Sequence, residues 1–164
     1  MPTVLYPGSF DPVTNGHVRT IVRLKKMFGD VVVLVADSSR KKYLFTSSER
    51  VELIRKSLSD KKIKVVADPG LTVDAARRVG AQLIARSVRS VADWEYEYSL
   101  ADANKQLDGD IETVFITADR ESGFISSSLV KEIAQLDGDV SRFVPAPVDE
   151  ALKKMFKKTK KQMR

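Results

Sequence analysis

The chain has 164 residues, of which 43% are hydrophobic and 30% are charged, with no cysteine and one histidine. This length suits one domain with a single core. The lack of cysteine excludes disulfides, thiolate zinc sites and a cysteine nucleophile, and one histidine excludes a histidine metal cage. Any metal is expected to be a hard cation such as Mg²⁺, held by carboxylates and substrate phosphates.

The net charge of +6 comes from the C-terminal end of the chain. Residues 151–164 carry +7, so residues 1–150 are near neutral at −1. Such a segment could bind nucleic acid or an anionic surface, but Phe156 is its only aromatic residue, and single-strand binders stack bases on aromatic side chains. We expect a domain over 1–150, a basic helix or tail over 151–164 whose end frays, and no nucleic-acid partner.

No apolar run approaches the length of a membrane span, and the N-terminus lacks a signal pattern. We therefore expect a cytoplasmic protein without a membrane partner.

Short apolar runs alternate with helical patterns along the chain. The expected strands cover residues 3–6, 30–37, 63–67, 82–85 and 112–117. The expected helices cover residues 18–28, 47–58, 73–79, 91–107 and 127–136. This alternation predicts an α/β fold, a single doubly wound Rossmann-like domain with a five-stranded parallel sheet and helices on both faces.

The segment from Tyr6 to His17 joins the first strand to the first helix. It contains glycines, the hydroxyl of Ser9 and, where the helix begins, the single histidine. Phosphates bind at helix N-termini, where backbone N–H groups are unsatisfied. Taken alone, the segment also fits a tight turn with a solvated capping histidine.

Three further segments follow predicted strands, and they are Ser38–Lys42, Arg86–Arg89 and Phe124–Ser128. Taken separately, the first fits a solvated basic loop, the second a pair of surface arginines, and the third the N-cap of a helix. At one end of a parallel sheet, however, they bring together guanidinium groups, an ammonium, hydroxyls and helix N-termini. A polyphosphate site requires this set of groups.

No residue has the pattern of an activated nucleophile. Ser9 has no Asp–His relay that the sequence reveals. The groups instead favour phosphoryl or nucleotidyl transfer, in which the protein positions the reactants and neutralises developing charge.

The residues Pro7–Pro12 and Thr14–His17 resemble the TxGH form of the HxGH motif in the nucleotidyltransferase superfamily. Lys41–Lys42 ahead of Phe45, Arg86-x-x-Arg89 leading to Glu97, and Phe124–Glu132 are together similar to the bacterial phosphopantetheine adenylyltransferase family. The resemblance covers about the first 150 residues. It implies transfer of AMP from ATP to 4′-phosphopantetheine, which gives dephospho-coenzyme A and pyrophosphate, with Mg²⁺ and a homohexameric assembly.

The resemblance also implies roles for individual residues. His17 stabilises charge on the α-phosphate, Lys41 and Arg86 hold the acceptor phosphate, and Arg89 holds the pyrophosphate. The residues expected to be catalytic are His17, Ser9, Lys41, Arg89 and Ser128. Those expected to bind phosphopantetheine are Ser9, Lys41, Thr72 and Arg86. Those expected to bind ATP are Ser9, Phe10, His17, Ser87, Val88, Arg89, Glu97, Ser122, Gly123, Phe124, Ile125, Ser126, Ser127 and Ser128. No protein ligand for the metal is expected.

Two departures from the family pattern concern the nucleotide. Ser87 stands where the family usually has glycine, and a positive φ there costs a serine about 1 kcal/mol or more. Ser122-Gly123 replaces an aromatic residue. Two other functions stay open, namely a sister transferase acting on nicotinamide mononucleotide or a sugar phosphate, and a nucleotide- or nucleic-acid-binding module without catalysis. The choice of acceptor distinguishes the sister transferase from the expected enzyme. Deletion of residues 151–164 distinguishes the binding module, because the enzyme should keep its turnover without this segment.

Overall fold

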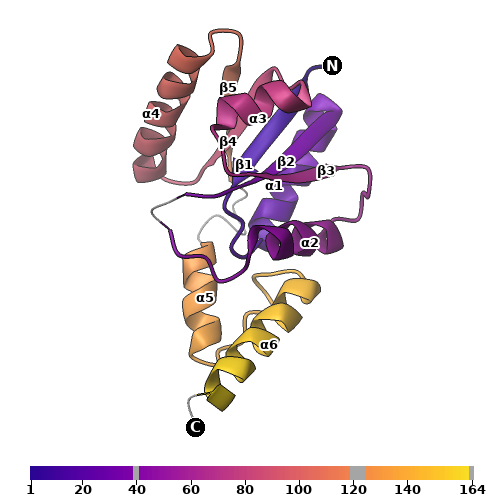
Figure 1. The fold of residues 1–164 in the computed structure, drawn as a ribbon, viewed down its shortest axis with the longest axis vertical. Helices are drawn as coiled ribbons and strands as arrows, with labels where there is room; N and C mark the ends of the chain where they lie inside the picture. Colours follow the sequence, from indigo (N-terminus) through magenta and orange to yellow (C-terminus); the bar gives the residue numbers. More distant parts are fainter. Residues whose placement is uncertain (39–40, 119–124, 163–164) are drawn as a thin grey trace.

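Alternating strands and helices build a five-stranded sheet in the computed structural model, which describes residues 1–38, 41–118 and 125–162 (Figure 1). The strands are β1 (Thr3–Gly8), β2 (Asp30–Ala36), β3 (Lys64–Asp68), β4 (Leu83–Val88) and β5 (Glu112–Thr117). Their order is β3-β2-β1-β4-β5, and every pair is parallel. The predicted fold class is confirmed. The strand order reverses between β1 and β4, where open parallel sheets bind ligands.

The helices are α1 (Asn15–Phe28), α2 (Ser47–Ser57), α3 (Thr72–Val79), α4 (Val91–Leu107), α5 (Ser127–Gln135) and α6 (Ala146–Gln162). Helix α1 begins at Asn15 rather than at residue 18, because Thr14 and His17 form a reciprocal cap on its first turn. Strand β4 continues past residue 85 to Val88, since Arg86 pairs with Phe115 of β5 although it is not apolar.

The two faces of the sheet are covered by different helices. Val4 and Val33 face the core shared with α1, α2, α5 and α6, whereas Leu5 and Leu34 face α3. This alternation is the two-residue period of strands buried on both sides. Helix α4 packs on the edge of the sheet through Trp94, whose ring lies 4.6 Å from that of Phe115.

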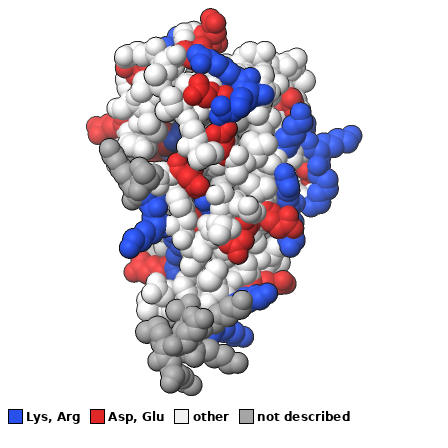
Figure 2. Space-filling model, in the orientation of Figure 1, with Lys and Arg blue, Asp and Glu red and all other residues white. Residues whose placement is uncertain are grey.

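Helices α5 and α6 extend below the sheet, and the C-terminus lies at the far end of the molecule from the N-terminus (Figure 1). Helix α6 begins at Ala146 and continues past residue 150, where the sequence suggested a boundary between the domain and the basic tail. Val148 and Leu152 on this helix are fully buried. Its first turns therefore belong to the core. On the face in Figure 2, basic and acidic side chains are interspersed. None of the helices in the described ranges is long and apolar enough to cross a membrane.

Candidate active site

A cavity of about 730 Å³ lies at the carboxyl edge of the sheet. Its volume is within the range of small-molecule sites, about 300–1,000 Å³. The four segments singled out in the sequence all contribute to its walls. The expected site residues that line it are Ser9, Phe10, His17, Lys41, Thr72, Arg86, Ser87, Arg89, Glu97, Ile125, Ser126, Ser127 and Ser128.

The other expected residues lie elsewhere or are not described. Val88 ends β4 and does not line the cavity. Ser122, Gly123 and Phe124 lie outside the described residues. Ser87 lies within β4 without a positive φ, so serine at this position carries no backbone strain.

The imidazole of His17 is fixed by the backbone that precedes α1. The Thr14 N–H donates to His17 Nδ1 at 3.0 Å, and the His17 N–H donates to Thr14 Oγ1 at 3.4 Å. Because Nδ1 accepts this bond, the proton of the neutral ring is on Nε2. Burial, with a further contribution from the positive charge of Arg89, lowers the pKa of His17 to about 4. Near neutral pH, His17 is therefore an uncharged hydrogen-bond donor.

Phe10 forms one wall beside this histidine. Its φ is +49°, a conformation that costs a non-glycine residue about 1–2 kcal/mol. Its buried ring lies edge-on to the rings of His17, at 5.1 Å, and Tyr6, at 5.6 Å. Gly8 leaves room for the Phe10 ring, because a Cβ atom on Gly8 would lie 2.8 Å from it. Backbone strain of this kind is concentrated at functional sites.

Asp11 ties the β1–α1 loop to the residues that follow Lys42 and to helix α5. Its buried carboxylate accepts the N–H groups of Leu44 at 2.9 Å and Phe45 at 3.0 Å, and the Lys131 ammonium at 2.7 Å. Neither Asp11 nor Lys131 is among the residues expected from sequence. Both lie inside the segments that carry the resemblance, but nothing in a single sequence shows that they meet.

Among the described residues, every carboxylate that lines the cavity is paired with a cation. The pairs are Asp11–Lys131, Asp37–Arg50, Asp93–Arg89 and Glu97–Arg86. The Arg50 pair lowers the pKa of the Asp37 carboxyl, chiefly through its hydrogen bond. Lys41 Nζ lies 3.4 Å from Ser9 Oγ, and no carboxylate in the described part of the chain pairs with it. The Lys41 charge is therefore available to an anionic ligand.

These pairings bear on the expected Mg²⁺. Among the residues that the structure describes, no group of three or more His, Cys, Asp or Glu side chains could hold a metal ion. The described side chains therefore do not fit a protein-held metal, and we derive no step through one.

The start of α5 lines the cavity and lies beside the loop that leads into α1. Ser126 caps the helix by accepting the Leu129 N–H at 3.1 Å, and the Ser127 hydroxyl donates to the Pro12 carbonyl at 2.8 Å. Ser128 is exposed. Two of the three serine hydroxyls thus hold the helix in place, and the helix N-terminus itself is what favours an anion.

A parallel sheet whose switch point combines a neutral imidazole, a lysine with no carboxylate partner among the described residues, and helix N-termini defines a nucleotidyltransferase-like α/β protein. The family model described as cytidylyltransferase-like matches residues 5–133. The chain is 45% identical over 155 residues to the phosphopantetheine adenylyltransferase of Prochlorococcus marinus strain AS9601, over 94% of this chain and 99% of the relative. It is 47% identical over 150 residues to the phosphopantetheine adenylyltransferase of Lacticaseibacillus paracasei strain ATCC 334, over 90% of each chain. The chain therefore belongs to the phosphopantetheine adenylyltransferase family, within the cytidylyltransferase-like proteins.

Proposed function

We propose that this protein transfers AMP from ATP to 4′-phosphopantetheine and releases pyrophosphate, as the names of its relatives indicate. A phosphate oxygen of the acceptor attacks the α-phosphorus of ATP. The bond from that phosphorus to the bridging oxygen breaks, and pyrophosphate leaves with the electron pair. The observation that carries this proposal is the cavity itself, because Lys41, Arg86, His17, Arg89 and the start of α5 all line it.

The acceptor phosphate is assigned to Lys41 and Arg86. Lys41 lies next to Ser9, and Arg86 lies at the end of β4 with its Nη1 3.4 Å from the Pro7 carbonyl oxygen. An ammonium and a guanidinium together suit a dianionic phosphate, since charge-assisted hydrogen bonds are about twice as strong as neutral ones.

The transition state is assigned to His17, Arg89 and the N-terminus of α5. With its Nδ1 occupied by the Thr14 N–H, His17 presents its Nε2–H as a fixed donor for an α-phosphate oxygen. Its low pKa keeps the ring neutral near neutral pH, so it acts as a hydrogen-bond donor and not as a charged group. Arg89 and the α5 N–H groups neutralise the charge that grows on pyrophosphate. Preorganised donors of this kind supply most of the rate enhancement in such reactions.

The finer expectations stay predictions. Mg²⁺ is expected to arrive bound to the triphosphate, because the lining carboxylates of the described residues are already paired. The homohexamer is proposed from the family resemblance, and the cytoplasmic location is proposed from the lack of an apolar run as long as a membrane span.

Pyrophosphate release from ATP tests the proposal when it is measured with a set of acceptors. We expect release with 4′-phosphopantetheine and none with nicotinamide mononucleotide, a sugar phosphate or water. Release with nicotinamide mononucleotide alone would identify a sister transferase instead. Nucleotide binding without release for any acceptor would identify a binding module.

A further inference from the structure

Helix α2 places a buried arginine, Arg50, behind Ser9 and the segment 41–46, outside the lining of the cavity. Arg50 is 1% exposed, and it is among the largest side chains that the core encloses. It occupies a position of the inward face of α2 together with Leu53 and Ile54. A buried arginine is retained only where its charge and donors are satisfied.

The guanidinium of Arg50 makes bonds in three directions. Nε donates to the Phe45 carbonyl at 3.0 Å, Nη1 donates to the Ser9 carbonyl at 2.8 Å, and Nη2 pairs with Asp37. Its Cζ atom also lies 4.2 Å from the centre of the Tyr43 ring, in a cation–π contact. Arg50 therefore binds the β1–α1 loop, the end of β2 and the segment 41–46 together.

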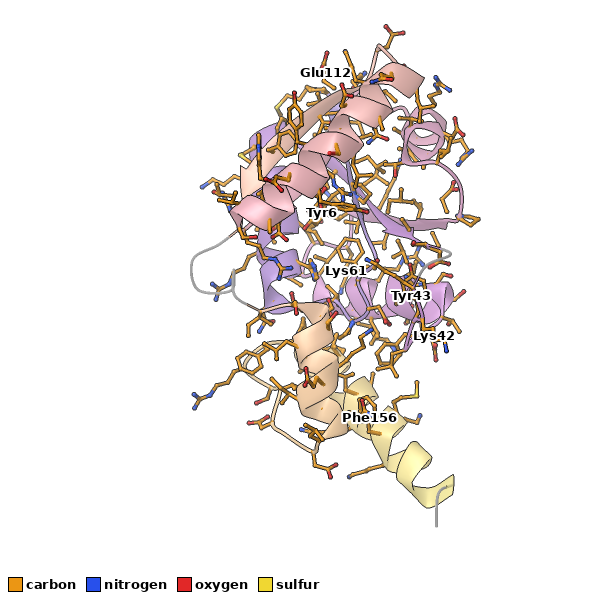
Figure 3. The ribbon with its side chains drawn as sticks, turned by 90° about the vertical axis from the view of Figure 1, so that its left-hand side faces the viewer. Tyr6, Lys42, Tyr43, Lys61, Glu112 and Phe156 are labelled. Atoms are coloured by element: carbon orange, nitrogen blue, oxygen red, sulfur yellow. The ribbon has the colours of Figure 1, made fainter. Side chains whose placement is uncertain are left out.

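The segment 41–46 carries Lys41 and is held from two sides. Asp11 accepts the N–H of Phe45, whereas Arg50 binds the carbonyl of that residue. Tyr43 and Lys42 lie in this segment beside α2 (Figure 3). The Ser9 residue whose carbonyl binds Arg50 also places its hydroxyl 3.4 Å from Lys41 Nζ. One buried side chain thus fixes both the hydroxyl and the ammonium on this side of the cavity.

We propose that Arg50 is a positioning residue for the acceptor phosphate, and that it acts by holding the segment 41–46 against Ser9. The inference rests on the proposed function, because it assigns the acceptor to Lys41. Arg50 does not line the cavity, so the ligand does not touch it. A lysine at position 50 would keep the charge opposite Asp37 but would lose the planar fork that reaches two carbonyls.

Binding of each substrate to Arg50→Lys tests the inference by calorimetry, with 4′-phosphopantetheine and ATP titrated separately. We expect the Kd for 4′-phosphopantetheine to rise about tenfold, and the Kd for ATP to stay within about twofold of the wild-type value. A purely structural role would lower the melting temperature and leave the ratio of the two Kd values unchanged. Equal losses for both ligands, or no loss for 4′-phosphopantetheine, would overturn the inference.

Arg55→Lys is the matched control, because Arg55 lies on the same helix and donates to the Val65 carbonyl at 2.8 Å, away from the cavity. It should leave both Kd values unchanged. If Arg50→Lys does not fold, Tyr43→Leu decides, since it removes the ring beside the guanidinium and keeps the pair with Asp37. Because Tyr43 also lines the cavity and its hydroxyl accepts the Ser38 N–H at 2.6 Å, Tyr43→Phe, which keeps the ring and loses the hydroxyl, is its control. Tyr43→Leu should weaken the binding of 4′-phosphopantetheine selectively, and equal losses for both ligands or no loss would again overturn the inference.

Wild-type protein that binds no 4′-phosphopantetheine would overturn the proposed function and the inference together. Normal binding by the wild type and unaffected binding by Arg50→Lys would overturn the inference alone.

Discussion

Arg86 and Glu97 form an ion pair between the end of β4 and the first half of α4, and their side chains are only 18% and 16% exposed. The family resemblance places them in different subsites, Arg86 with the acceptor phosphate and Glu97 with ATP. The Arg86 guanidinium is also 3.4 Å from the Pro7 carbonyl. With its carboxylate bound to Nε, Glu97 therefore sets the direction in which Arg86 presents its remaining donors.

Replacing Glu97 by alanine should consequently affect the acceptor more than the nucleotide. Without the carboxylate, Arg86 loses the bond that orients it. We expect the KM for 4′-phosphopantetheine to rise about tenfold, which corresponds to about 1.4 kcal/mol, and the KM for ATP to change less than about twofold. Steady-state kinetics with each substrate varied in turn measures both. Glu95→Ala, on the exposed face of the same helix, is the control, and a larger effect on ATP would place Glu97 in the nucleotide subsite.

The protonation of His17 can be observed directly, because it is the only histidine in the chain. We expect its imidazole signals to titrate with a midpoint of about 4, and the neutral ring to carry its proton on Nε2. The unfolded chain binds this proton at a higher pH, near the usual 6.5. Between these values the unfolded state holds more protons, so acidification lowers the stability of the fold. Heteronuclear NMR gives the midpoint and the tautomer, and a midpoint near 6.5 in the folded protein would contradict the burial of the ring.

His17→Ala should mainly slow the chemical step. Removing a donor that acts on charge developing in the transition state lowers kcat by about 10²- to 10³-fold. The KM for ATP should change little, because the donor stabilises the transition state more than the bound substrate. Rapid-quench measurement of pyrophosphate formation separates this step from product release. The free energy of unfolding is measured in parallel, because the ring also caps α1. A variant that loses stability but keeps kcat would reduce His17 to a capping residue.

Much of the fold followed from local patterns. The β-branched run of β2 and the capping box that opens α2 are visible in the sequence because they depend on neighbours a few residues apart. The clustering of the four segments around one cavity also followed, since the carboxyl ends of parallel strands lie at one edge of the sheet. The Gly8–His17 turn and the Arg86–Arg89 segment accordingly meet at one cavity.

The remaining features depend on contacts between distant parts of the chain. Asp11 and Lys131 are separated by 120 positions, and Arg50 binds a carbonyl 41 positions away. The one local signal for these contacts was the position of Arg50 on the same helix face as Leu53 and Ile54. A charged residue on an apolar face needs a buried partner. Which partner it finds depends on the tertiary structure.

Gly8→Ala tests whether close packing beneath Phe10 supports the site. The new Cβ atom would lie 2.8 Å from the Phe10 ring, and this ring cannot move without disturbing His17, which it meets at 5.1 Å. Overpacking of this kind costs about 1–3 kcal/mol, so we expect a lower urea midpoint together with a reduced kcat. Gly109→Ala is the matched control, because no atom lies within 4 Å of its added Cβ and its φ is not positive. It should change stability by less than about 0.5 kcal/mol and leave kcat unaltered. Equal behaviour of the two variants would show that Phe10 can shift freely, and that its strained backbone does not hold the histidine in place.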